Sequence, residues 1–234
     1  MRVRSFRSIA VVATTSISLM MASASWARRL ADAEIFIEIN ATDGDAGIHL
    51  FLDGEGWDRM RVFDPDGQQI LDFAGHGSVG IQGITELAFE SAEPSFEEQP
   101  LEDFLALFPE GIYRFEGTTT EGKLLRGRAR LTHAIPEAPV LLSPADGEVV
   151  DTENAVFEWA LVPDPPGSEI VGYEVIVIAE EPPLGEFSAE VSPTTTSITA
   201  PAGFMVSGSV YKWEVLAIEA SGNQTISEAE FETE

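Results

Sequence analysis

Apolar and polar side chains alternate along most of this chain, and this pattern restricts the fold more than any other feature. Isoleucine fills every second position of 35–39, and apolar residues do the same in 211–217. A period of two is typical of half-buried strands, and Gly, Pro, Asn and Asp turns separate the segments. We therefore predict an all-β protein of antiparallel sheets. Apolar residues at helical spacing predict a single short helix near 100–108.

A proline-marked stretch divides this pattern into two regions. Pro136 and Pro139 favour an extended connection and discourage continued strand pairing. Each flanking region contains about seven short segments with strand character, the number found in an immunoglobulin-like sandwich. We predict two tandem immunoglobulin-like antiparallel β-sandwiches, at 31–134 and 139–234, joined by a linker at 135–138.

The first segment has the layout of an export signal. Arg2, Arg4 and Arg7 precede a charge-free apolar run at 9–21, and small residues follow it. The run is shorter than the roughly 20 residues that cross a bilayer, which favours a cleaved signal peptide over a membrane anchor. We predict a signal peptide at 1–27 and a secreted or periplasmic mature protein without a membrane span.

Composition excludes several classes of function. The 234 residues include no Cys, which excludes disulfides, thiolate zinc sites and thiol nucleophiles. The formal net charge of −27 argues against nucleic acid and anionic lipid as partners, because like charges repel. Hydrophobic residues make up 44% of the chain, enough for packed cores. The sequence therefore indicates a folded acidic protein.

The second region carries four motifs, "SPADG" at 143–147, "FEW" at 157–159, "GYEV" at 172–175 and "YKWEVLA" at 211–217. Together they resemble the fibronectin type III family. The resemblance covers about 139–233. It implies that Trp159 lies at the centre of the core and that Tyr211 is a corner tyrosine, whose hydroxyl bonds the preceding loop.

Three further aromatic residues are expected to be structural. Tyr173 and Trp213 occupy apolar positions of alternating strands in the second region. Tyr113 follows a Pro and Gly corner in the first region, as Tyr211 follows Gly208 in the second. This parallel favours a second immunoglobulin-like sandwich in the first region, which resembles no named family.

Acidic loops in the first region could bind calcium. One set of candidate ligands consists of Asn40, Asp43 and Asp45, and a second set, in a later loop, consists of Asp64 and Asp66. Calcium takes six to eight oxygen ligands, which adjacent loops could supply. Asp-Gly and Asp-Pro-Asp-Gly sequences are also turn formers whose side chains bond their own backbone, and this alternative is favoured. We expect no other cofactor.

Exposed aromatic rings form another candidate site. If the isoleucines of 35–39 face the core, then Phe36 faces outward, and the same alternation places Phe51 and Phe63 outward, with Trp57 in a "DGEGW" turn. Such rings could stack on sugars or contact a protein. Alternatively, the 92–108 segment or the second region covers them.

Arg126, Arg128 and Arg130 alternate on the last strand of the first region and form a basic stripe in a very acidic chain. They could bind an anion or a partner. The favoured alternative is charge pairing with acidic side chains of a neighbouring strand, or protection of a sheet edge.

No residue set supports catalysis. His49, His76 and His133 are far apart in sequence, and none stands in a nucleophile motif. We therefore predict a non-catalytic binding, adhesion or spacer protein that presents its surfaces to an extracellular protein or polysaccharide. A carbohydrate-binding accessory module is the second hypothesis. A small hydrolase is the least favoured.

Overall fold

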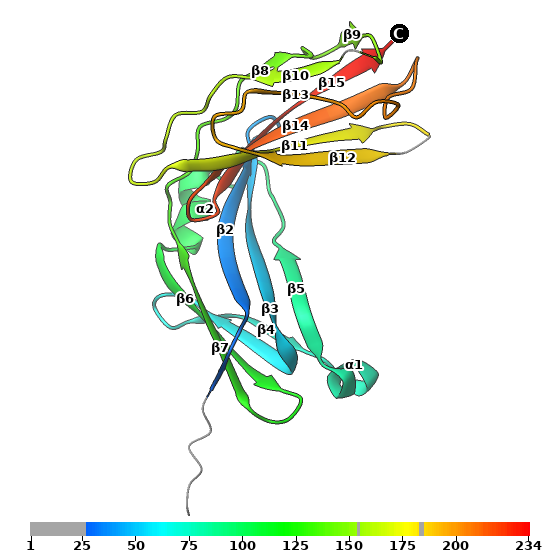
Figure 1. Cartoon of the computed structure of the whole chain (residues 1–234). Coiled ribbons are helices and arrows are strands. Elements are labelled where there is room, and N and C mark those ends of the chain that lie inside the picture. Colours follow the sequence, from blue (N-terminus) through cyan, green and yellow to red (C-terminus); the bar gives the residue numbers. More distant parts are fainter. Residues whose placement is uncertain (1–26, 154, 183–184) are drawn as a thin grey trace, which may run out of the picture.

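The computed structural model describes residues 27–153, 155–182 and 185–234, so the predicted signal peptide lies outside the described residues except for Ala27. The described part is built mainly of β-strands (Figure 1), which confirms the all-β prediction. The elements of the first sandwich are β1 (Arg28–Arg29), β2 (Asp32–Asn40), β3 (Asp45–Phe63), β4 (Gln69–Ala74), α1 (Gly77–Gln82), β5 (Ile84–Glu90), α2 (Leu101–Leu107), β6 (Gly111–Thr119) and β7 (Leu124–Leu131).

One long bent strand, β3, joins the two layers of the first sandwich. Its first half pairs with β2 and β5, and its second half pairs with β4 and β6. The register shifts between Asp53 and Trp57, where Gly54 and Gly56 lie. Glycine leaves the backbone free to bend there. The "DGEGW" sequence is therefore a bend within one strand, and the expected turn between two strands is wrong.

The first core lies between these layers. It is lined by alternate residues of β2, β3, β6 and β7, and β1 pairs with β7 to close one side. Helix α2 forms where a helix was predicted and buries Phe104 in this core. Helix α1 lies at the end distant from the second sandwich (Figure 1) and overlaps the "GHGSVG" sequence of 75–80. None of its residues is buried, so it has no buried apolar face of the kind that makes a helix predictable from sequence.

The second sandwich packs two sheets face to face. A three-stranded sheet, β13-β10-β8, faces the sheet β12-β11-β14-β15. Its strands are β8 (Leu141–Ser143), β9 (Glu148–Val150), β10 (Val156–Trp159), β11 (Ile170–Ala179), β12 (Glu186–Val191), β13 (Ser197–Thr199), β14 (Val210–Glu219) and β15 (Gln224–Thr233). This two-sheet arrangement is that of an immunoglobulin-like sandwich.

Aromatic side chains fill the second core. Trp159 and Trp213 are almost completely buried, and the ring of Trp159 meets that of Tyr173 edge-on at 5.6 Å. The Tyr211 hydroxyl accepts a hydrogen bond of 2.8 Å from the Val206 backbone, as a corner tyrosine does. In the first sandwich, the buried Tyr113 donates from its hydroxyl to the Pro109 carbonyl at 3.1 Å.

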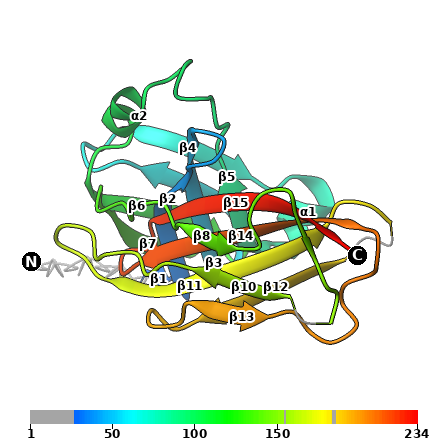
Figure 2. The ribbon, with the colours of Figure 1, turned by 90° about the horizontal axis from the view of Figure 1, so that it is seen from above.

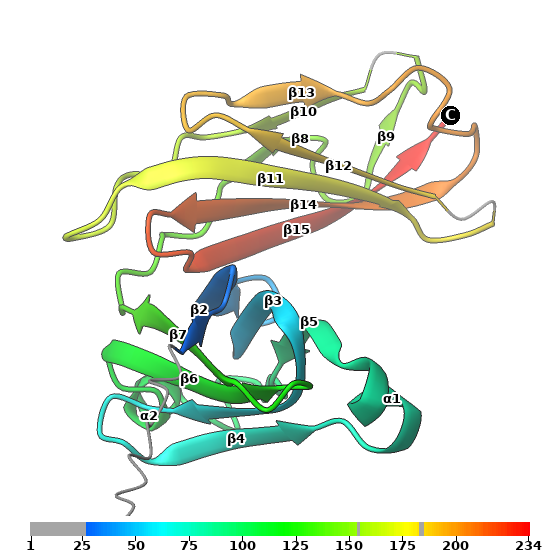
Figure 3. The ribbon, with the colours of Figure 1, turned by 60° about the horizontal axis from the view of Figure 1, so that its bottom comes forward.

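The two sandwiches share backbone hydrogen bonds. Strand β15 pairs in parallel with the end of β2 over Gln224–Ile226 (Figure 3), so one sheet runs from the first sandwich into the second. Seen from above, the β14–β15 layer lies across β2 and β3 (Figure 2). Neither helix of the described residues is long and apolar enough to cross a membrane.

The turn between β14 and β15 fixes this junction. Asn223, fully buried, accepts a 2.9 Å hydrogen bond from the Ile37 backbone and donates one of 2.9 Å to the Thr132 carbonyl. Thr225 donates to the Pro136 carbonyl at 2.9 Å. The predicted linker is therefore held by side chains of the second sandwich.

Candidate functional site

Six arginines gather on the outer face of one sheet of the first sandwich. The buried residues of β3, β6 and β7 face the core at every second position, so the residues between them face outward. The arginines on this outward side, which we call the arginine face, are Arg59, Arg61, Arg114, Arg126, Arg128 and Arg130, and Glu116 lies among them, opposite Arg61 and Arg126 in the strand register. It holds six of the ten Lys and Arg residues that follow residue 27. Basic charge is thus concentrated on one surface of an otherwise acidic protein.

Half of the arginine face has a partner. Arg59 forms a bidentate ion pair with Asp72, and this pair lowers the pKa of the Asp72 carboxyl. The guanidinium groups of Arg61 and Arg114 lie over the Phe63 ring, at 5.6 Å and 5.5 Å from its centre. These three arginines are therefore held against the sheet.

The other half has no ion pair. Arg126, Arg128 and Arg130 are exposed, and within the described residues none has a carboxylate within 4.0 Å. Arg126 lies opposite Glu116 in the strand register, but Arg128 lies opposite Arg114. The favoured sequence interpretation was charge pairing or protection of a sheet edge; no ion pair within 4.0 Å forms for these three residues in the described part of the chain, and edge protection stays a prediction. Their guanidinium groups are available to an external anion.

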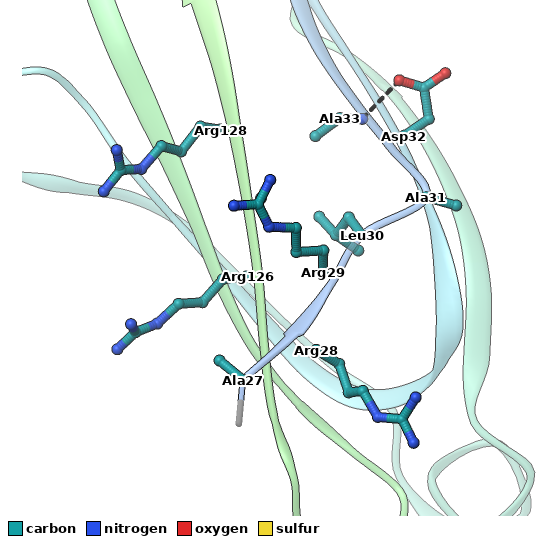
Figure 4. Close-up of a pocket in the computed structure, with 10 residues that line it drawn as sticks. Ala27, Arg28, Arg29, Leu30, Ala31, Asp32, Ala33, Arg126 and Arg128 are labelled. Atoms are coloured by element: carbon teal, nitrogen blue, oxygen red, sulfur yellow. Dashed lines mark hydrogen bonds between the residues drawn. The ribbon is translucent and has the colours of Figure 1, made fainter. Parts of the chain in front are cut away.

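A groove runs beside this unpaired stripe. It lies between Ala27–Ala33 and Arg126–Arg128 and has a volume of about 710 Å³. The side chains of Arg126 and Arg128 extend to one side of β7, whereas Arg28 extends away from them (Figure 4) and pairs with Glu55 at 2.9 Å. A Cβ at Gly127 would lie 2.6 Å from the Leu30 side chain. Glycine at 127 therefore lets the groove walls approach closely.

The four candidate aromatic residues do not form one exposed platform. Trp57 is fully buried in the first core, so its expected exposure is wrong. Its position inside β3, after the register shift at the glycines, turns the side chain inward. Phe36 is half-buried: it stacks on His49 at 5.0 Å, and a Cβ at Gly222 of the second sandwich would lie 3.4 Å from its Cβ. Phe51 is half-buried, and two guanidinium groups cover Phe63.

The candidate calcium ligands take part in turns. The Asn40 side-chain oxygen accepts hydrogen bonds from the backbone of Thr42 and Asp43, at 3.0 Å and 3.1 Å. The side chain of Asp64 accepts one of 2.7 Å from the Gln68 backbone. Asp66 is exposed in the same turn, and Asp45 is half-buried at the start of β3. These contacts agree with the turn-forming alternative, and calcium binding stays a prediction.

A different set of residues has the geometry of a metal site. One ligand atom each of Glu38, His49 and Glu93 lies within 4.8 Å of the others, and this is the one such group among the described residues. Burial and the nearby carboxylates of Glu90 and Asp45 raise the pKa of Glu93 to about 7. Sequence alternation places His49 and Glu38 outward on neighbouring strands, but nothing in the sequence brings Glu93 to them.

The histidines do not form catalytic pairs. His76 is exposed before α1, and Nε2 of His133 lies 2.9 Å from the Phe108 carbonyl. In the described ranges, no Ser or Thr hydroxyl is hydrogen-bonded to a histidine ring. The nucleophile and base required for a hydrolase are therefore not brought together there.

Among known proteins, the chain is similar to solved structures. No protein-family model matches the chain, and no curated protein matches it. A tetra-tandem repeat in the extending region of a large adhesion protein is similar at 12% identity and a TM-score of 0.30, over 85% of this chain and 48% of that one. The FN1–FN3 domains of chicken CNTN1 are similar at 14% identity and a TM-score of 0.36, over 88% of this chain and 65% of that one. The chain spans less than two thirds of either structure.

Proposed function

We propose that this chain is an exported, non-catalytic binding protein whose arginine face takes an acidic polymer as partner. The unpaired stripe of Arg126, Arg128 and Arg130 is the observation that carries this proposal. Its residues stand at every second position of one strand, about 6.6–6.8 Å apart. Charges at this spacing suit an extended chain that carries regularly placed carboxylate or sulfate groups, since guanidinium groups bind such anions in a bidentate manner.

The negative charge of the whole chain should restrict an acidic partner to the arginine face. The chain as a whole repels polyanions, so an acidic partner approaches favourably only where basic charge outweighs the surrounding carboxylates. The groove between Ala27–Ala33 and Arg126–Arg128 gives such a partner a second wall. The partner is an extracellular or periplasmic polysaccharide or protein, and the chemistry common to both is the repeated anionic group.

The second sandwich supports a spacer role. We assign it to the fibronectin type III family on its motifs, its two-sheet arrangement and its corner tyrosine Tyr211. Its shared sheet with the first sandwich favours one rigid body, which would hold the arginine face at a fixed distance from the C-terminus. Stacking of neutral sugars is less well supported, because Trp57 is buried and Phe36 is half-buried and already stacked on His49.

Binding to two probes tests the proposal. The probes are polygalacturonate, an acidic polysaccharide, and polyglutamate, an acidic polypeptide. The double variant Arg126→Gln/Arg128→Gln should lose at least about tenfold in affinity for the bound probe, because two charge-assisted contacts disappear. Binding by the unaltered protein should weaken with added NaCl. Lys212→Gln is the matched control, since Lys212 lies on β14 of the second sandwich and does not line the groove, and it should leave the affinity within about twofold.

The two probes divide the partner classes. Tighter binding of polygalacturonate favours a polysaccharide partner, and tighter binding of polyglutamate favours a protein. Equal affinities of the double variant and the unaltered protein would contradict the proposal, and so would binding that does not respond to salt.

A further inference from the structure

Glu38, His49 and Glu93 lie on the opposite layer of the first sandwich from the arginine face, close to the second sandwich. Glu38 is on β2, His49 is on β3, and Glu93 is in the segment that follows β5. Nε2 of His49 lies 3.9 Å from Oε1 of Glu38, and both side chains are only 17% exposed. Two carboxylates and an imidazole therefore converge at a largely buried position.

The imidazole ring of His49 is held in place by stacking, but its Nε2 atom lacks a hydrogen-bond partner. Its Nε2 atom is buried and has no hydrogen-bond partner, and the ring stacks on Phe36 with an interplanar angle of 12°. Oδ1 of Asp45, whose charge acts on Glu93, is also buried without a partner. Buried polar atoms are rarely left unpaired, because each costs about 1–3 kcal/mol. The unpaired Nε2 beside two carboxylates points to a ligand that accepts electron pairs.

The backbone leaves room for this convergence. Gly47 lies opposite Glu38 in the β2–β3 register, and a Cβ at 47 would lie 2.5 Å from Oε1 of Glu93. A larger residue would displace the Glu93 carboxylate. From the second sandwich, the Gln224 amide donates to Oε2 of Glu38. Such a hydrogen bond fixes the orientation of a metal-binding carboxylate.

We propose that Glu38, His49 and Glu93 bind one divalent transition ion of the zinc class at the junction of the two sandwiches. Imidazole is a ligand for zinc-class ions, whereas calcium takes oxygen ligands, so this site differs in chemistry from the calcium loops predicted from the sequence. Zinc bonds of about 2.0–2.1 Å place tetrahedral ligands about 3.3 Å apart, so Glu38 and His49 need to close only slightly. A water molecule would complete the coordination.

The ion would also strengthen the junction. It would hold Glu38, which Gln224 contacts from the second sandwich, and it would offset the repulsion between carboxylates that the fold brings together. The proposal does not depend on the arginine face, which lies on another sheet layer.

Calorimetric titration of untagged protein with Zn²⁺ tests the site. Excess Mg²⁺ should be present to occupy the general acidic surface. We expect one equivalent of Zn²⁺ to bind and the melting temperature to rise. His49→Ala and Glu93→Gln should each weaken binding at least about tenfold. The exposed His76→Ala and Glu97→Gln are matched controls that should leave the affinity unchanged.

A measurement on the unaltered protein guards against misfolded variants. Nitrogen NMR of the histidine side chains should show that Zn²⁺ shifts Nε2 of His49 and leaves His76 unchanged. Three outcomes would each overturn the proposal: no Zn²⁺ binding, Zn²⁺ binding that His49→Ala does not weaken, or an unchanged chemical shift of His49 Nε2 at saturating Zn²⁺.

Discussion

Removal of the Asn223 side chain should destabilise the whole molecule, because this residue satisfies groups of both sandwiches. In Asn223→Ala, the Ile37 N–H and the Thr132 carbonyl lose their partners at a fully buried position. Each unsatisfied buried group costs about 1–3 kcal/mol, so the free energy of unfolding should fall by about 2–6 kcal/mol. This is a large fraction of the stability of an ordinary domain.

An isosteric variant separates hydrogen bonding from packing. Asn223→Asp keeps the shape and the acceptor for Ile37, but its second oxygen faces the carbonyls of Thr132 and Ala134. The charged carboxylate should therefore destabilise the protein at pH 7. Its pKa in the folded state should be raised, so its destabilising effect should disappear as the pH falls and the carboxyl becomes able to donate.

Urea denaturation followed by tryptophan fluorescence measures the loss, and small-angle scattering measures whether the sandwiches separate. Both variants should give a larger radius of gyration than the unaltered protein if the junction opens. Unfolding free energies of both variants within about 0.5 kcal/mol of the unaltered protein would refute the reasoning, since exposed substitutions have effects of that size.

Three further substitutions probe other features. Glu219 is fully buried, and its two oxygens accept only from N–H and O–H donors, so Glu219→Gln should cost about 1–3 kcal/mol in urea unfolding because the new amide faces a donor. Burial raises the pKa of Glu174, and so do the negative charges of Glu190, Glu186 and Glu38. A hydrogen bond with Ser188 opposes this shift in part. A carboxyl with a raised folded-state pKa favours folding below its unfolded-state pKa and loses that contribution as the pH rises, so Glu174→Gln should raise the melting temperature at pH 7 more than at pH 4. Gly117→Ala should lower the melting temperature, because its Cβ would lie 2.7 Å from the Arg59 carbonyl, and the cost should be about 1–3 kcal/mol; an unchanged melting temperature would contradict that close approach.

Alternation made most of the strands predictable. The inward positions of β2, β11 and β14 follow directly from apolar residues at a period of two, and α2 follows from helical spacing. The long strand β3 was not predictable, because glycines in a strand and glycines in a turn look alike in sequence. Trp57 was misplaced for this reason.

The candidate surface was only partly predictable. The sequence placed Arg126, Arg128 and Arg130 on one side of a strand, but only the pairing of β3, β6 and β7 shows that Arg61 and Arg114 share their face. Likewise, the cluster of Glu38, His49 and Glu93 depends on where the segment after β5 lies. Such long-range neighbours leave no local pattern in the chain.

The junction shows most clearly how a local motif can mislead. Asn223, Gln224 and Thr225 match the Asn-x-Thr glycosylation pattern, which is typical of an exposed loop. In the fold, the Asn223 amide nitrogen is buried against the Thr132 carbonyl, and the Thr225 hydroxyl is bonded to Pro136. A glycan on Asn223 would require the two sandwiches to part. The polar residues of this motif therefore connect two hydrophobic cores, and they hold the linker, which the sequence predicts as an extended connection, as part of one body.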